Sequence, residues 1–223
     1  ETQETLSQEW VSAEPLAMSQ DQALWAALAF EDAGKVATLL KKGADPDKPE
    51  ELSQMTPLMA AETAPIATLL LEHGANIAMR DRMGRTALHY AVMMRDAAQI
   101  IPLLIRQGAD VNSRASNGDT PLMVAVENYS DEKEKGNNKD WAIRELVHLG
   151  ADIHAADSRS RTPLAIAASH NQVELIRLLM QLGANPAKPL SNGRLPLDYA
   201  RENNANDAIK VLEPVTPKAP FQN

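Results

Sequence analysis

Histidine is the residue type in this sequence best suited to acid–base catalysis or metal binding near neutral pH, and the chain has five. His148 and His154 flank one turn but belong to different predicted elements, and no further ligand is spaced to complete a zinc site with them. The chain has no cysteine, no His-Glu-x-x-His segment, no nucleophile elbow and no glycine-rich phosphate loop. We therefore expect no catalytic residue, no metal site and no cofactor, and we classify the chain as a protein other than an enzyme.

Acidic residues that follow Gly-Ala are the second group with catalytic potential. Aspartate stands there at residues 45, 110 and 152, and asparagine at residues 76 and 185. Both side chains accept hydrogen bonds from the nearby backbone in turns. Because the same residue types return in every unit, we interpret these positions as turn formers rather than as catalytic acids.

Two recurring strings define the elements that must position these side chains. Gly-Ala-Asp or Gly-Ala-Asn begins at residues 43, 74, 108, 150 and 183, and Thr-Pro-Leu or a close variant begins at residues 56, 86, 120, 162 and 195. Threonine caps a helix start and proline suits its first position, whereas glycine after an apolar stretch ends a helix. Between the two markers lie two short apolar segments with helical spacing. The pattern predicts stacked pairs of helices.

A unit that reads Thr-Pro-Leu, Ala-Ala, a Leu-Leu helix and Gly-Ala-Asp resembles the ankyrin repeat. The segment Thr-Ala-Leu-His-Tyr-Ala at residues 86–91 is similar to the family's characteristic segment, and the resemblance covers residues 21–213. It implies an all-α solenoid of stacked helix-turn-helix units joined by β-hairpin-like loops. It also implies that His89 forms hydrogen bonds between neighbouring hairpins, and it places Glu31 where the family usually has glycine.

The markers divide the chain into units that differ in regularity. The unit from Thr56 is three residues short, with Pro65 opening its second helix, and another unit carries a polar insertion at about residues 128–140 that is either a solvated loop or a binding finger. Terminal repeats of a solenoid are expected to be atypical. The predicted divisions are an acidic flank (1–20), an N-terminal capping repeat (21–52), four repeats (53–82, 83–116, 117–158 and 159–191), a C-terminal capping repeat (192–213) and a Pro-rich extended tail (214–223).

Composition limits the classes of partner. The net charge of −8 argues against nucleic acid, which requires a basic surface, and against an anionic membrane surface. No apolar run reaches the roughly 18 to 20 residues of a membrane span, so we expect no direct membrane insertion. The absence of cysteine and a first residue other than methionine fit a processed chain in the periplasm or another extracytoplasmic compartment, and a cytoplasmic location is the alternative.

The resemblance also implies where a partner binds, because ankyrin proteins usually use the hairpin tips and the exposed side of the first helices. The arginines among these positions and the adaptable methionines beside them predict a protein partner with an acidic and partly apolar surface. The predicted partner-binding residues are Met55, Arg82, Met83, Arg85, Met93, Met94, Asn117, Asp119, Asn128, Tyr129, Arg159, Arg161, Ser169, His170, Asn192 and Arg194.

Three functions follow as hypotheses. The first is a protein–protein interaction module without catalysis, in the form of an immunity protein that binds and blocks a secreted bacterial toxin such as a type VI lipase effector. This form rests on the resemblance to free-standing, extracytoplasmic bacterial ankyrin proteins. The second is an intracellular adaptor or regulator of a signalling or host protein, which lacks a signal peptide. The third is an enzyme, which requires convergent catalytic groups that the sequence does not display.

Overall fold

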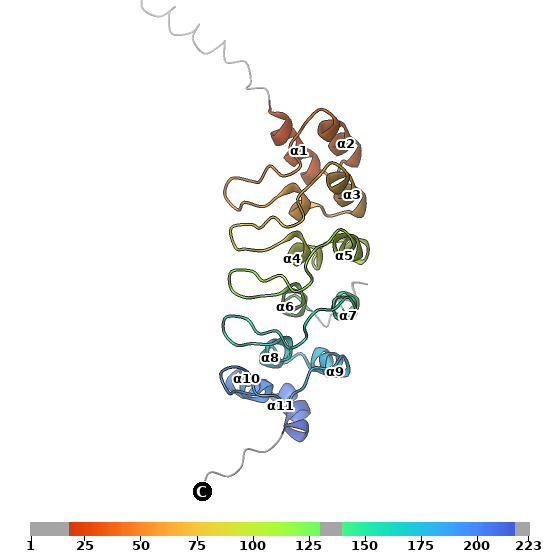
Figure 1. Ribbon diagram of the computed structural model, residues 1–223. Coiled ribbons are helices and arrows are strands. Elements are labelled where there is room, and N and C mark those ends of the chain that lie inside the picture. The colour runs from red at the N-terminus through yellow and green to blue at the C-terminus, as the bar shows by residue number, and fades with distance from the viewer. Residues whose placement is uncertain (1–17, 130–139, 217–223) are drawn as a thin grey trace, which may run out of the picture.

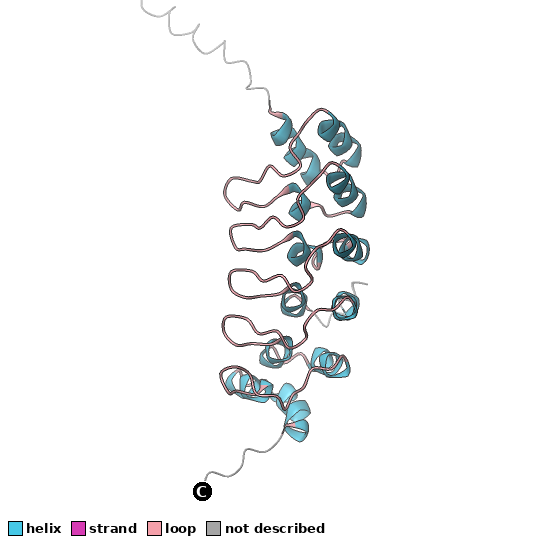
Figure 2. Cartoon of the chain, viewed as in Figure 1, coloured by secondary structure: helices cyan, strands magenta, loops and turns pink. Residues whose placement is uncertain are grey.

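The computed structural model describes residues 18–129 and 140–216. Over these ranges the chain forms pairs of helices stacked into two columns, with hairpin loops projecting from one side (Figure 1). Figure 2 shows only helices and loops in the described ranges, which confirms the predicted all-α solenoid. The inner column, beside the hairpins, comprises α1 (Gln20–Ala29), η1 (Pro57–Ala60), α4 (Ala87–Ala91), α6 (Pro121–Glu127), α8 (Pro163–Ser169) and α10 (Pro196–Glu202). The outer column comprises α2 (Ala33–Lys41), α3 (Ala64–Glu72), α5 (Ala97–Arg106), α7 (Asp140–His148), α9 (Val173–Gln181) and α11 (Asn206–Leu212).

Threonine starts the inner helices as the sequence predicts. The hydroxyls of Thr56, Thr120 and Thr162 each accept a hydrogen bond from the backbone N–H three residues later, and proline follows each of them. In the last unit Leu195 replaces threonine, and the carboxylate of Asp198 accepts the hydrogen bond of its backbone N–H at 2.8 Å instead. Local capping therefore determines where each inner helix begins.

Stacking supplies the stability that such short helices lack alone. In α8, every side chain from Leu164 to Ala168 is buried, and the helix packs against both α6 and α10. Each buried leucine or isoleucine contributes about 1.5–3 kcal/mol, and the alanines let neighbouring helices approach closely. No helix within the described ranges has the length and hydropathy that a membrane crossing requires.

The turns that end the helices also follow the sequence. Asp45, Asp110 and Asp152 each accept a hydrogen bond from the backbone N–H two residues later, at 2.8–2.9 Å, which confirms that they are turn formers. Glu31, in the position expected for glycine, has a left-handed φ of 54°. Asn171 has the same conformation, with a φ of 57°, at the break predicted between α8 and α9.

Two other expectations concern segments outside the repeats. The predicted extended tail is wrong at its beginning, because Glu213–Val215 forms the 3-10 helix η3 and Thr216 is buried. The hydroxyl of Thr216 donates to the carbonyl of Leu212 at 2.8 Å, which holds this segment on α11. Most of the predicted insertion (130–139), the N-terminal flank up to residue 17 and the tail from residue 217 lie outside the described residues.

Neighbouring hairpins stack through backbone hydrogen bonds, and one glycine makes the stacking possible. The N–H of Ser158 donates to the carbonyl of Asn117 at 2.9 Å. A Cβ atom on Gly118 would meet that same Ser158 nitrogen at 2.8 Å, whereas a Cβ on Gly193 would meet nothing within 4 Å. Both glycines have positive φ, 84° and 76°, so they share the conformational requirement and differ in the closeness of the next hairpin.

We therefore expect Gly118→Ala to destabilise the chain more than Gly193→Ala. The left-handed conformation costs a residue with a Cβ about 1–2 kcal/mol in either variant, and overpacking against the next hairpin adds about 1–3 kcal/mol at residue 118 alone. Denaturant unfolding of both variants measures the difference. Equal losses would contradict the stacking argument.

Candidate functional site

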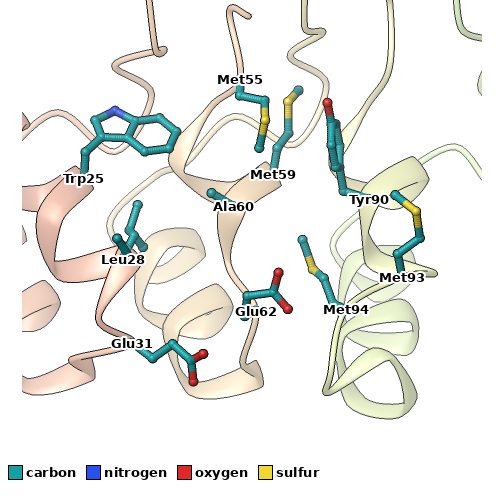
Figure 3. Close-up of a pocket in the computed structure, with 11 residues that line it drawn as sticks. Trp25, Leu28, Glu31, Met55, Met59, Ala60, Glu62, Tyr90, Met93 and Met94 are labelled. Atoms are coloured by element: carbon teal, nitrogen blue, oxygen red, sulfur yellow. The ribbon is translucent and has the colours of Figure 1, made fainter. Parts of the chain in front are cut away.

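A hollow of about 350 Å³ opens on the inner column at the N-terminal end of the stack. Figure 3 shows Met55, Met59 and Tyr90 along one side of it, with Met93 and Met94 at the end formed by the α4 unit. Side chains from three successive units build it, and most of them are apolar. The complete lining is Trp25, Leu28, Ala29, Glu31, Met55, Met59, Ala60, Glu62, Tyr90, Met93 and Met94. We call it the first hollow.

The charged residues of the first hollow are acidic. Glu31 and Glu62 line it, and both lie on the side opposite Met55 in Figure 3. Arg95 binds Glu31 through two hydrogen bonds of 2.6 and 2.7 Å, and these bonds raise the pKa of the arginine. The first hollow is therefore an apolar, methionine-rich depression with an acidic edge.

A second hollow of about 580 Å³ lies between the hairpins of residues 81–85 and 115–119 and the helix α6. Met93 lines both hollows and is 46% exposed. The two depressions are thus neighbours along the inner column. The complete lining of the second hollow is Arg82, Met83, Arg85, Met93, Ala115, Ser116, Asn117, Asp119, Val124, Glu127 and Asn128.

Arg85 is held inside its own hairpin rather than directed at solvent. Its Nε donates to Asp81 at 3.0 Å, and its guanidinium lies 4.7 Å from the ring centre of Tyr90. Burial alone would raise the pKa of Asp81, but hydrogen bonds from Tyr90 and Arg85 outweigh it and keep that pKa below its usual range. Burial, followed by the hydrogen bond to Asp81, raises the pKa of Tyr90 to about 12.

Two more of the predicted arginines are paired within the chain. Arg161 pairs with Asp157 at 2.7 Å and with Glu127 at 3.1 Å. Arg194 pairs with Glu202 at 2.6 Å and stacks on Tyr199, 4.1 Å from its ring centre. Such internal pairs hold these arginines in place and weaken their availability to a partner.

The prediction that five arginines contact a partner stays a prediction, and the structure divides these arginines into two groups. Arg85, Arg161 and Arg194 are paired within the chain, whereas Arg82 and Arg159 are exposed and form no ion pair within residues 18–129 and 140–216. The acidic partner surface stays a prediction that concerns mainly these last two. Carboxylates beside the other three arginines compete with a partner for their guanidinium groups.

Two other predicted contact residues are buried. Met94 is 8% exposed and Asp119 is 6% exposed, so the expectation that both lie on the open surface is wrong. Each still lines a hollow. Met94 lines the first hollow, and Asp119 lines the second.

The other predicted residues divide into two groups. Those that line one or both hollows are Met55, Met83, Met93, Asn117 and Asn128, and those that lie outside both are Tyr129, Ser169, His170 and Asn192. Tyr129 is half-buried and packs against the core. The hydroxyl of Ser169 donates to the carbonyl of Ile166 at 2.8 Å, while His170, the C-cap of α8, is exposed. Asn192 donates to the hydroxyl of Tyr199 at 3.0 Å. Whether these residues contact a partner stays a prediction.

Sequence reasoning missed several residues of the first hollow, namely Trp25, Leu28, Glu31, Met59, Glu62 and Tyr90. Trp25 belongs to the capping unit, which lacks the Thr-Pro-Leu marker that fixes repeat positions. Its indole N–H donates to the carbonyl of Lys48 at 3.1 Å, which orients the ring.

His89 has the structural role that the resemblance implied. The ring is fully buried; its Nδ1 accepts from the backbone N–H of Thr86 at 3.1 Å, and its Nε2 lies 3.0 Å from the carbonyl oxygen of Asp119 in the next hairpin. Because Nδ1 accepts, Nε2 must carry the proton of a neutral ring and donate it. The described residues contain no cluster of three or more side chains that could hold a metal ion.

This arrangement makes stability depend on pH. Burial lowers the pKa of His89 below 6.5, so the unfolded chain takes up a proton more readily than the folded chain. The contribution of neutral His89 to the free energy of unfolding is then at its full value above about pH 6.5. As the pH falls below that value, the free energy decreases by up to about 1.4 kcal/mol per pH unit, until the pKa of the folded state is reached. Denaturant unfolding at about pH 7.5 and 5 checks this. His89→Gln should flatten the dependence and His154→Gln, at an exposed position, should not; an unchanged slope in His89→Gln would exclude the assignment.

The chain is a helical repeat protein: its helix pairs stack, and a buried histidine links neighbouring hairpins. Side chains from successive units line the two hollows, which form its binding surface. The family description for ankyrin repeats matches residues 23–115 and 132–216, and the chain belongs to the ankyrin-repeat family. No curated protein matches the chain, whereas 560 chains of solved structures do.

One of these solved structures is a predatory endopeptidase from Bdellovibrio bacteriovorus in complex with an immunity protein. A chain of that complex is similar to this chain at 29% sequence identity, with a TM-score of 0.71. The similarity covers 86% of this chain and 97% of the other.

Proposed function

We propose that this chain is an immunity protein, which binds a secreted bacterial enzyme and blocks it. The observation that carries the proposal is the similarity, over almost the whole of the other chain, to a structure in which an immunity protein is complexed with an endopeptidase. Ankyrin repeats are interaction modules that bind through extended surfaces, and this chain presents such a surface in its two hollows. The neighbour favours a peptidase as the partner rather than the lipase considered from the sequence.

The mechanism proposed is occlusion without chemistry from the inhibitor. Met83 and Met93 are 56% and 46% exposed, and both line the second hollow. Flexible methionines adapt to an irregular partner surface, and burying such side chains on association supplies the affinity of a hot spot. An inhibitor must share a compartment with the enzyme that it blocks. Because the proposed partner is a secreted enzyme, the proposal includes a location outside the cytoplasm.

A capture and inhibition experiment tests the proposal. The immobilised chain is used to capture its partner from the cells that encode it, and the captured protein is purified and assayed on a peptide library with and without the chain. We expect a hydrolase whose turnover falls to zero at one equivalent of the chain. A captured protein that keeps full activity when saturated, or that has no enzymatic activity, would instead support an adaptor.

A further inference from the structure

The hairpins around the second hollow differ in how their charges are balanced. Two of them contain an internal ion pair between their first and fifth residues, Asp81–Arg85 and Asp157–Arg161. The hairpin between them begins with alanine and ends with Asp119. A carboxylate therefore occupies the position that holds arginine in the flanking hairpins.

The carboxylate of Asp119 is buried with incomplete partners. Its Oδ2 accepts a hydrogen bond from the side-chain amide of Asn117. Its Oδ1 is buried without a hydrogen-bond partner, and within the described part of the chain the carboxylate takes part in no ion pair. A buried carboxylate without a counter-ion is costly to the fold, and the protein alone does not compensate it.

Two of the other charged side chains of the second hollow, Arg85 and Glu127, are already engaged in ion pairs. Arg85 is held by the aspartate of its own hairpin, and Glu127 by an arginine of the next hairpin at 3.1 Å. Arg82 lies close enough to Glu50 to contribute, after the hydrogen bonds from Ser53 and Leu52, to lowering the pKa of that carboxyl. Asp119 is therefore the anionic group of the hollow that lacks a cation.

We propose that the second hollow receives a cationic side chain, an arginine or a lysine, of the protein partner, with Asp119 as its counter-ion. This inference rests on the proposed function in so far as the partner is a protein. Met83, Met93 and Val124 line the same hollow and cover the apolar stem of such a side chain while its head reaches the carboxylate. The partner thus supplies the charge that arginine supplies in the flanking hairpins.

The probe for this site is Nα-acetyl-arginine amide, and its matched control is Nα-acetyl-citrulline amide, which has the same shape without the charge. Both are titrated at millimolar concentrations into the ¹⁵N-labelled full chain while the amide signals of residues 117–120 are followed by NMR. We expect saturable shifts with the arginine probe alone. The amides of residues 190–194, in a hairpin that does not line this hollow, should not respond.

Asp119→Asn is the variant that separates charge from shape, because its amide oxygen can still accept from Asn117. We expect it to weaken binding of the arginine probe about tenfold, as loss of a charge-assisted contact does, without lowering the thermal midpoint. Asp81→Asn should lower the midpoint, because it breaks an ion pair within the chain, and leave the probe response intact.

Equal shifts with citrulline, or an unchanged response in Asp119→Asn, would overturn the cation site. A lower thermal midpoint in Asp119→Asn, comparable to that of Asp81→Asn, would also overturn it, since the carboxylate would then serve the fold. These outcomes are independent of the capture experiment. The probe tests the chemistry of the hollow, and the inhibition assay tests what the whole chain does.

Discussion

His89→Ala is expected to lower the free energy of unfolding by about 2–4 kcal/mol. The imidazole is fully buried, so its removal leaves a cavity that the stacked helices cannot close without moving. It also removes the partners of two buried backbone groups, the N–H of Thr86 and the carbonyl of Asp119. Because these groups belong to successive hairpins, the loss uncouples the third unit from the fourth.

Denaturant unfolding measures the effect, and two further variants serve as comparisons. His148→Ala, at an exposed position near the end of α7, should change the free energy by less than about 0.5 kcal/mol. His89→Gln should fall between the two, since an amide can restore part of the hydrogen bonding. A loss below about 1 kcal/mol in His89→Ala would mean that water or a side-chain shift replaces the bridge.

Met93→Glu should weaken inhibition of the partner enzyme about 100-fold. Met93 lines both hollows, so a charge at this position disrupts the apolar surface where the two hollows meet. The side chain is 46% exposed in the free protein, and a glutamate at that position can remain in water until the partner covers it. The energy lost on binding is that of an apolar hot spot plus the desolvation of an unpaired carboxylate.

The matched control is Val215→Glu. Val215 is 44% exposed, nearly as much as Met93, but it lies on η3 at the C-terminal end of the described chain. We expect unchanged inhibition for this variant and unchanged thermal midpoints for both. Equal inhibition by Met93→Glu and the unaltered chain would place the partner on another surface. Charge reversal at Arg85 is a poorer test, because it also breaks the hairpin's own ion pair with Asp81.

Much of the fold follows from the sequence because the signals are local. A threonine hydroxyl caps the helix that begins at the next residue, and an aspartate carboxylate closes a turn two residues away. One irregular feature was also predicted from a local signal: Pro65, expected to open the second helix of its unit, lies in the first turn of α3. The start of the C-terminal tail was mispredicted, because the burial of Thr216 depends on α11 rather than on the prolines around it.

What the sequence by itself determined is the repeat, the starts of its inner helices and its turn formers, all of which depend on neighbours within a few residues or on the regular spacing of units. The bridging role of His89 came from the resemblance to the family. Only the tertiary structure decided which side chains are available to a partner. Arg161 is engaged by Glu127 from the preceding unit. Trp25, Met59 and Tyr90 line one hollow only because three units stack. Within the described residues Asp119 has no counter-ion, because the first position of its own hairpin is Ala115 and not a basic residue, and no cation from a neighbouring unit pairs with it. Charge balance and concavity are properties of side chains brought together from separate units, so they emerge with packing and not with local sequence.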